Sequence, residues 1–181
     1  MSRLYLIRHG KTWANEQHLY CGSSDLPLSQ KGREELKLLR YNISNVRFLT
    51  SGMKRTEETL HCLFGEVPYE AVPQFREIDF GVFELHSYEE LKDDPAYQKW
   101  ISGDHESNPT PGGESGVQVQ QRVLGALPML DGQDTVLITH GGVIAIIMQR
   151  LFPEEGKSRY AWQPEPGYGY EIKDRQYHAI P

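Results

Sequence analysis

Two histidines stand directly beyond short apolar runs of this chain. His9 comes one residue after the run Leu4–Ile7, and His140 immediately follows the run Thr135–Thr139. Runs of this kind predict short strands buried on both faces of a parallel sheet. Open parallel sheets place their ligand sites just beyond the carboxyl ends of the strands, so both imidazoles are candidates for one site. Taken singly, each could equally be a satisfied structural histidine.

Three charged side chains are expected at the same edge of the sheet. Arg8 precedes His9, Arg55 falls in the first turn of a helix expected after the strand Val46–Thr50, and Glu77 lies among alternating acidic and apolar residues. Guanidinium groups match phosphate oxygens in a bidentate way, and a neutral imidazole is a competent nucleophile. A carboxylic acid can protonate a departing alkoxide. Together these groups predict phosphoryl transfer through a histidine.

The elements that must position these groups alternate between strand and helix. This alternation predicts an α/β fold, a three-layer α/β/α sandwich around a mostly parallel sheet, within a single domain spanning residues 1–181. The coil Gly103–Gly116 is either a surface insertion or a lid over the site. The expected strands are 4–7, 46–50, 69–72, 135–139 and 168–172, and the expected helices are 29–41, 54–63, 88–101 with a break at Pro95, 117–130 and 143–152.

Composition narrows the class of protein. The net charge is −6, which argues against general nucleic-acid binding. Cys21 and Cys62 form no C-x-x-C pair, so we expect reduced thiols and a cytoplasmic location. We also expect no secretory leader, because the first strand begins almost at once, and no membrane contact, because no apolar run approaches the length of a span.

Four segments carry a resemblance to a known family. They are Arg8–Thr12 with Asn15, Thr50–Arg55, Arg76–Gly81 and Thr139–Gly142. In this order they resemble the motifs of the histidine phosphatase superfamily, which includes cofactor-dependent phosphoglycerate mutases and many bacterial phosphomonoesterases. The resemblance implies a phosphoglycerate mutase-like fold and a small phosphorylated substrate as partner, and we expect no cofactor and no metal. Nothing in the sequence indicates an oligomeric state.

The resemblance also implies roles for individual residues. His9 is the expected nucleophile, which becomes phosphohistidine, and Glu77 is the expected proton donor and later the base that activates water. His140 completes the expected catalytic set. The residues expected to contact the phosphate are Arg8, Asn15, Arg55 and His140, with Thr12 and Gly141 as lesser candidates.

Substrate-side features are less specific. The resemblance places Tyr20–Ser24 and the coil around Gly112–Ser115 at the mouth of the site. Family members often carry glycine after the aromatic-Glu pair that this chain has at residues 83–84, and Leu85 stands there instead, which changes the turn beside the site. His86 either reaches the substrate or simply begins the next helix.

Four other functions compete with hydrolysis: a zinc site, a nucleotide-cofactor site, a phospho-ligand binding module and mutase-type transfer. A zinc site would place two arginines beside a dication, and no glycine pattern fits a nucleotide cofactor. A non-catalytic phospho-ligand binding module would be expected to lack one of His9, Glu77 and His140, and all are present. The resemblance also implies that mutases of the family have longer chains, with extra loops that exclude water. The 181 residues of this chain leave little material for such loops, so hydrolysis is favoured over mutase-type transfer. Similar short bacterial phosphatases act on α-ribazole 5′-phosphate or on sugar phosphates, which are therefore the expected substrates.

Overall fold

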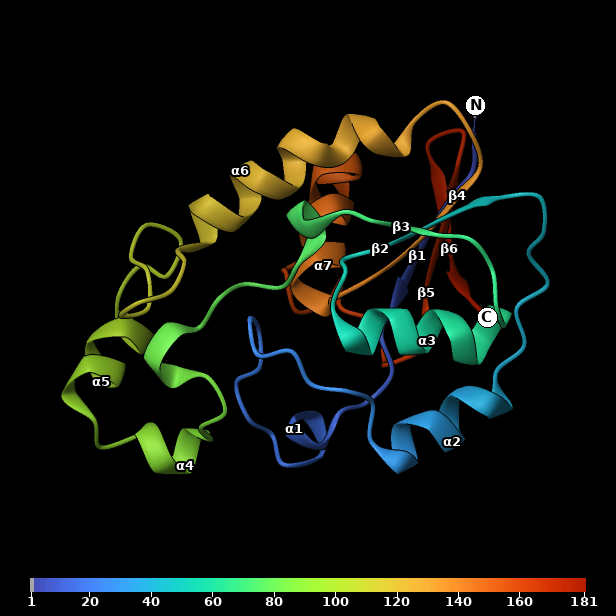
Figure 1. The fold of residues 1–181 in the computed structure, drawn as a ribbon. Coiled ribbons are helices and arrows are strands. Elements are labelled where there is room, and N and C mark those ends of the chain that lie inside the picture. The colour runs from blue at the N-terminus through green and yellow to red at the C-terminus, as the bar shows by residue number, and fades with distance from the viewer. Residues whose placement is uncertain (1) are drawn as a thin grey trace.

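A single mixed sheet organises the fold. We describe residues 2–181 from a computed structural model, in which six strands run in the order β3-β2-β4-β1-β5-β6 (Figure 1). Strands β3, β2, β4 and β1 are parallel, whereas β5 pairs antiparallel with β1, and β6 antiparallel with β5. The mostly parallel sheet is thus confirmed. The strands are β1 Leu4–Arg8, β2 Arg47–Thr50, β3 Glu70–Ala71, β4 Thr135–Thr139, β5 Gly169–Lys173 and β6 Gln176–Ile180.

Helices cover both faces of this sheet, as the three-layer prediction requires. The α-helices are α1 Trp13–Glu16, α2 Gln30–Leu38, α3 Lys54–Phe64, α4 Tyr88–Leu91, α5 Pro95–Ile101, α6 Gly116–Ala126 and α7 Gly141–Leu151. In β1, Leu6 packs into the core beneath α6 and α7, whereas Tyr5 and Ile7 pack into the opposite core with Leu60 of α3. This alternation explains the continuous apolar run, because side chains of successive strand residues point to opposite faces.

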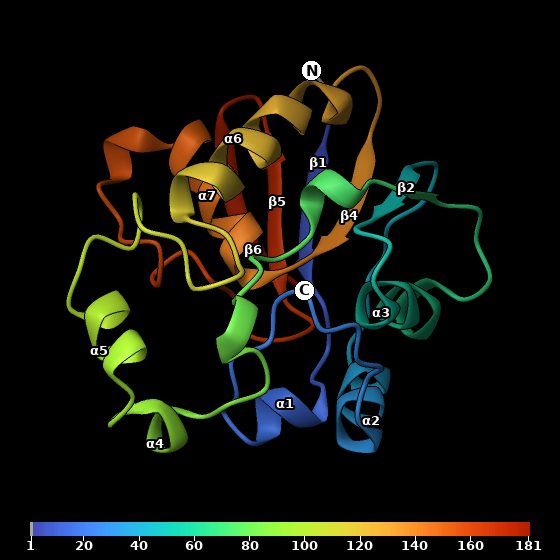
Figure 2. The same ribbon diagram turned by 60° about the vertical axis from the view of Figure 1, so that its left-hand side comes forward.

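A third group of helices stands apart from the sheet. Figures 1 and 2 both show α4 and α5 beside α1, away from the strands. Phe83, Leu91 and Tyr97 form a small core of their own in this segment. The predicted break at Pro95 is confirmed, because Asp94 caps α5 by accepting hydrogen bonds from the backbone N–H groups of its first turn.

Three local predictions were wrong. The polar stretch 13–27, rich in glycine and serine, predicts a loop after β1, but it contains α1, which begins with a capping box between Thr12 and Asn15. The spacing of Leu36, Leu38 and Leu39 predicts a shared apolar face on this helix, but Leu38 is 80% exposed, because α2 turns the face that carries Gly32 and Leu36 toward the core. Strand β6 was missed, since its hairpin turn uses Asp174 and Arg175 at positive φ without a glycine.

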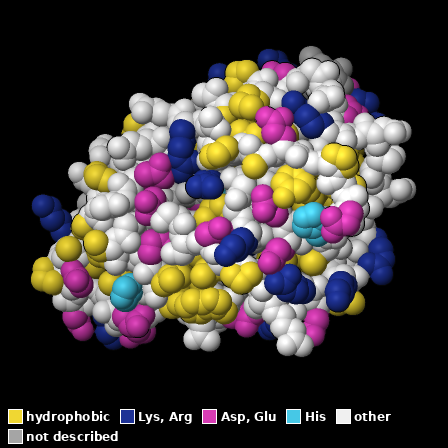
Figure 3. All heavy atoms as spheres, in the orientation of Figure 1, with side chains coloured by type: hydrophobic (Ala, Val, Ile, Leu, Met, Phe, Trp, Pro, Cys, Tyr) yellow, Lys and Arg dark blue, Asp and Glu magenta, His cyan; other side chains and the backbone are white. Residues whose placement is uncertain are grey.

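The distribution of surface charge and the apolarity of the helices can be compared with the predictions on nucleic acid and membranes. Acidic and basic side chains are interspersed on the face that Figure 3 shows, without a continuous basic stripe. In the described part of the chain, no helix combines the length and apolarity needed to cross a bilayer.

Candidate active site

His9 lies directly beyond β1, with its ring buried. Its backbone N–H donates to the carbonyl of Thr139 on β4, so the two neighbouring strands fix its position. Its Nδ1–H donates to the carbonyl of Gly10 at 2.6 Å. Because a neutral imidazole carries one proton, this hydrogen bond assigns the lone pair to Nε2. His9 therefore presents an oriented Nε2 that can act as a nucleophile.

His140, at the end of β4, lies beside His9. Their ring centroids are 5.1 Å apart, and His140 is fully buried. Its Nε2 lies 2.8 Å from Oγ of Ser51, which lies 3.2 Å from Oγ1 of Thr56. The Thr56 hydroxyl donates to the carbonyl of Met53, so the Ser51 hydroxyl is free to donate to Nε2 of His140, and this arrangement leaves the imidazole proton on Nδ1. Nδ1 of His140 is buried without a protein partner.

Burial sets the protonation state of both imidazoles. Desolvation, reinforced by the positive charges of Arg55 and Arg8, holds the pKa of His9 well below its usual 6.5. Burial and the charge of Arg55 likewise hold the pKa of His140 well below that value. Both histidines are therefore neutral at pH 7, which is the form a nucleophile requires. The arginines also lower both pKa values, but burial is the larger cause.

Two guanidinium groups are held at the same edge. Arg55, in the first turn of α3, is only 1% exposed and donates to the carbonyls of Ser24 and Gly22 at 2.8 and 2.7 Å. Arg8 donates to the carbonyl of Pro164 at 2.8 Å. Nε of each arginine is buried without a protein partner. Because orphaned buried donors are costly, these nitrogens suit the oxygens of an anion.

Glu77 is held against the start of α7. Its carboxylate accepts hydrogen bonds from the backbone N–H of Gly142 and of Ile78, each at 3.0 Å. Arg122 of α6 holds the segment that carries Glu77, because its guanidinium donates hydrogen bonds to the carbonyls of Gln74, Arg76 and Glu77. The carboxylate thus has a defined orientation at the edge where α7 begins, within electrostatic reach of Arg8 and Arg55.

A second carboxylate organises the loop that holds Arg55. Glu84 accepts hydrogen bonds from the backbone N–H groups of Gly22, Ser23, Ser24 and Phe80 and from the Ser24 hydroxyl. Glycine is required at position 22, because a Cβ there would lie 1.5 Å from the carbonyl oxygen of Ile78. Glu84 therefore fixes the carbonyls that orient the Arg55 guanidinium.

The lesser phosphate candidates have different positions. The Thr12 backbone N–H and hydroxyl both donate to Oδ1 of Asn15, at 2.9 and 3.0 Å. Thr12 thus orients the Asn15 amide, and its own proton is already engaged. Gly141 is the first residue of α7, where backbone N–H groups lack intrahelical partners. A Cβ at Gly141 would lie 3.2 Å from Cζ of Arg8, so this backbone lies close to the guanidinium.

The mouth of the site differs in part from the sequence prediction. Tyr20 lines the cavity beside Glu77, as expected, but the coil contributes His105, Glu106 and Gly116 to this wall, and the Gly112–Ser115 stretch is absent from it. Gly113 instead packs against Asp79. Leu85, which stands where the family often has glycine, adopts a left-handed backbone with φ 61°. His86 is exposed, and its Nδ1–H donates to the carbonyl of Glu84 at 2.9 Å.

Sequence reasoning missed Ser51, Glu84 and Arg122 as positioning residues. Ser51 and Glu84 stand inside segments that were singled out, so their proximity to the motifs was an available signal. Arg122 carries no such signal, because its contacts with the Glu77 segment lie 45–48 residues away along the chain. Within residues 2–181, no group of three or more His, Cys, Asp or Glu side chains is arranged to hold a metal ion.

Comparisons with known proteins agree with this geometry. A sequence model of the histidine phosphatase superfamily (branch 1) matches residues 4–167. The chain is 29% identical over 176 residues to the adenosylcobalamin/alpha-ribazole phosphatase of Salmonella typhimurium, covering 91% of this chain and 87% of that protein. It is 26% identical over 168 residues to the 2,3-bisphosphoglycerate-dependent phosphoglycerate mutase of Rhizobium etli, covering 83% and 80%. The crystal structure of phosphoglycerate mutase from Thermus thermophilus superimposes with a TM-score of 0.78 at 29% identity, covering 99% of this chain and 98% of that one.

Proposed function

The chain belongs to branch 1 of the histidine phosphatase superfamily, and we propose that it is a metal-independent phosphomonoesterase that acts through a phosphohistidine. The observation that carries this proposal is the state of His9. Its Nδ1–H is tied to the Gly10 carbonyl, it is buried, and its pKa is held well below 6.5 by burial and the neighbouring guanidiniums. A neutral imidazole with a free Nε2 facing anion-binding groups is suited to attack phosphorus.

In the first step, Nε2 of His9 attacks phosphorus while the bond between phosphorus and the ester oxygen breaks. Protonated Glu77 gives its proton to that oxygen, so the alcohol leaves neutral. In the second step, Glu77 takes a proton from water, the water oxygen bonds to phosphorus, and the phosphorus–nitrogen bond breaks. Inorganic phosphate leaves and His9 is regenerated.

The surrounding groups stabilise the charge on the phosphoryl oxygens. Arg8 and Arg55 supply the buried Nε donors, and His140, Asn15 and the backbone at the start of α7 add further contacts. Removing one such pre-organised donor typically costs about 10²–10³ in rate. No step requires a metal, because the guanidiniums supply the positive charge.

The substrate is a small phosphorylated metabolite. The Salmonella relative is named for alpha-ribazole, which supports α-ribazole 5′-phosphate as one substrate of this chain, with sugar phosphates as the broader alternative. The rhizobial relative is a mutase, so phosphoglycerate isomerisation is the competing outcome. Both cysteines are free thiols, which fits a cytoplasmic enzyme acting as a single domain.

The test is phosphate release, measured with chelator present, from p-nitrophenyl phosphate, 3-phosphoglycerate, ribose 5-phosphate and α-ribazole 5′-phosphate. The protein should release phosphate and form an acid-labile phosphoenzyme, and His9→Ala should do neither. His178→Ala is the matched control, because His178 lies on β6 with its side chain 65% exposed. Isomerised 3-phosphoglycerate without phosphate release would identify a mutase, and inhibition by chelator would refute the metal-independent mechanism.

A further inference from the structure

The coil that leads into α6 pairs with the segment that carries Glu77. The Glu114 N–H donates to the Asp79 carbonyl at 2.9 Å. Glycine is required where the two backbones meet, because a Cβ at Gly113 would lie 2.3 Å from the carbonyl oxygen of Asp79. This part of the coil, expected at the mouth of the site, therefore lies against the Glu77 segment instead.

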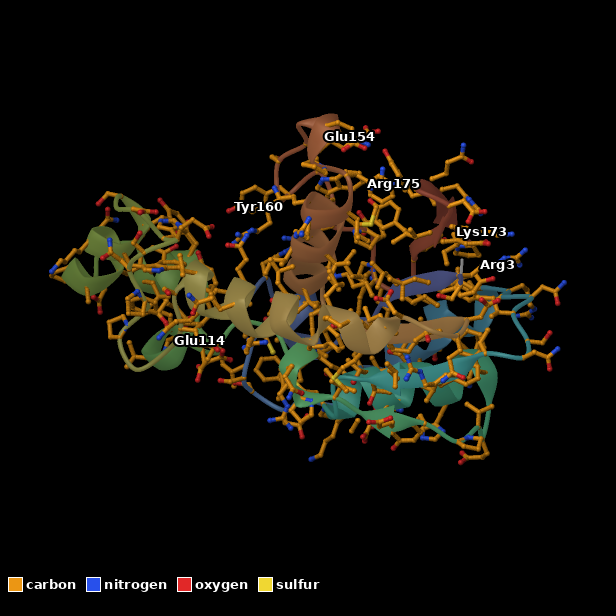
Figure 4. All side chains as sticks on the ribbon, turned by 90° about the horizontal axis from the view of Figure 1, so that it is seen from above. Arg3, Glu114, Glu154, Tyr160, Lys173 and Arg175 are labelled. Carbon is orange, nitrogen blue, oxygen red and sulfur yellow. The ribbon has the colours of Figure 1, made fainter. Side chains whose placement is uncertain are left out.

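The Glu114 carboxylate makes three hydrogen bonds at this contact, close to the start of α6 in the view from above (Figure 4). Its Oε2 accepts from the Asp79 N–H at 3.0 Å and from Nη2 of Arg122 at 2.8 Å, and its Oε1 accepts from Nε of Arg122 at 2.9 Å. Paired bonds between a guanidinium and a carboxylate are among the strongest hydrogen bonds in proteins. The side chains of Glu114 and Arg122 are only 27% and 23% exposed, so salt and water screen this pair less than an exposed one.

Arg122 connects Glu114 to the backbone around Glu77. Its remaining donors reach the carbonyls of Gln74, Arg76 and Glu77, at 2.9, 2.6 and 3.0 Å. An arginine has five N–H donors, and all of them are thus used by Glu114 and these carbonyls. Without the paired bonds to Glu114, the guanidinium would be free to turn away from the carbonyls.

The Glu77 segment is irregular, so side chains must hold it. Residues 76–80, which the structure describes in full, belong to no helix or strand. Buried backbone groups that are outside a helix or sheet need other hydrogen-bond partners. Glu114 and Arg122 supply such partners on both sides of Glu77, at the carbonyls up to Glu77 itself and at Asp79.

We propose that Glu114 is a positioning residue for the proton donor, which it holds in place through Arg122 and through the Asp79 N–H. The proposal rests on the proposed phosphatase activity and adds a role for the coil before α6. Glu77 must reach the ester oxygen while the bond to phosphorus breaks. A misplaced acid therefore slows that step chiefly for leaving groups that need a proton.

The test is Glu114→Gln, whose amide oxygen can still accept from the Asp79 N–H while its N–H groups face Nε of Arg122. The rate of phosphoenzyme formation is measured in single turnovers, with enzyme in excess over ethyl phosphate or p-nitrophenyl phosphate. We expect the rate to fall about tenfold for the ethyl ester and to change less than about twofold for the nitrophenyl ester, because nitrophenolate leaves without a proton.

Two further variants test whether Glu114 acts through Arg122. Arg122→Lys keeps the charge but loses the paired geometry, so it should give the same pattern. The double variant should lose no more than the larger of the two single losses, because residues that act as a unit are not additive.

Glu58→Gln is the matched control. Glu58 accepts hydrogen bonds from Nη2 of Arg33 and from the Leu28 N–H, and its side chain is 28% exposed, so its setting resembles that of Glu114. It lies on α3, outside the Glu77 segment, and its substitution should leave the ratio of the two rates unchanged. Loss of folded protein, followed by the melting temperature, lowers both rates alike and also leaves this ratio unchanged.

The outcomes separate this inference from the proposed function. A ratio in Glu114→Gln equal to that of the unaltered protein would overturn the positioning role and leave the phosphatase assignment intact. Additive losses in the double variant would show that Glu114 does not act through Arg122. If the unaltered protein forms no phosphoenzyme from either ester, the proposed function fails and the inference falls with it.

Discussion

Gly142→Ala tests the placement of Glu77 without touching either histidine. Gly142 is the second residue of α7, and its N–H donates to Oε2 of Glu77 at 3.0 Å. A Cβ at this position would lie 2.5 Å from Oε1 of Glu77, whereas ordinary contacts begin at 3.4 Å. Because a carboxylate at the end of a flexible side chain can move, we expect Glu77 to be displaced and α7 to remain intact.

The expected size of the effect follows from these distances. Oε1 must retreat by about 1 Å, and misplacement of a catalytic group by that amount can lower the rate about 10²-fold. This value lies within the contribution of about 10²–10⁴ that a general acid makes. Alanine is favoured over glycine inside helices by up to about 1 kcal/mol, so the free energy of unfolding should stay the same or rise.

The assay compares kcat for ethyl phosphate and p-nitrophenyl phosphate, together with the melting temperature. Alkoxide needs the proton from Glu77 far more than nitrophenolate does, so the ethyl ester should lose about 10²-fold and the nitrophenyl ester much less. Gly125→Ala on α6 is the matched control, because nothing lies within 4 Å of its Cβ position. Equal losses for both esters, or an unchanged rate for the ethyl ester, would refute the placement of Glu77 as the proton donor.

Three further perturbations have defined outcomes. The pKa values of His9 and His140 are held well below 6.5, chiefly by burial. Below pH 6.5 the unfolded chain therefore binds more protons than the folded one. The free energy of unfolding should fall on acidification by up to about 1.4 kcal/mol per pH unit for each imidazole. Urea unfolding between pH 7.5 and 5.5 measures this slope, and an unchanged slope in His140→Asn would contradict it. Ser51→Ala removes the 2.8 Å partner of His140 and should raise KM for phosphate esters up to about tenfold, and an unaltered KM would show that Ser51 does not position His140. Glu84→Gln should weaken competitive inhibition by inorganic phosphate several-fold, because the loop carbonyls that hold Arg55 lose their anchor, and a Ki equal to that of the unaltered protein would argue against this role.

The sequence predicted the arrangement of the catalytic groups because that arrangement is nearly local. His9 and His140 each follow a strand directly, and β1 and β4 are parallel neighbours paired residue by residue. Once both strands are recognised from their apolar runs, the geometry of a parallel sheet brings the imidazoles to one edge. Arg55 follows β2 in the same way, by way of the first turn of α3.

The positioning contacts could not be predicted by the same reasoning. Arg122 approaches the Glu77 segment from α6, and the Pro164 carbonyl that orients Arg8 lies 156 residues further along the chain. Such contacts depend on how helices and coils pack over the sheet, which neither hydrophobic period nor local propensity specifies. Leu85 is a further case, since its left-handed φ of 61° is unusual for a residue other than glycine and was not predictable from its type.

The alcohol side of the site is built on a different principle from the phosphate side. The phosphate groups follow strand ends and the first turns of the helices after them, so the sheet itself sets their spacing. The aromatic side chains that line the cavity instead come from the Tyr20 loop, from the Glu77–Phe80 segment, from α5 and its coil, and from the segment after α7, all outside the sheet. Substitutions at Trp100, His105 or Tyr160 can therefore change which alcohol fits without moving His9 or Arg55. We therefore expect the residues that select the alcohol to lie outside the sheet, chiefly in residues 95–116 and 156–163.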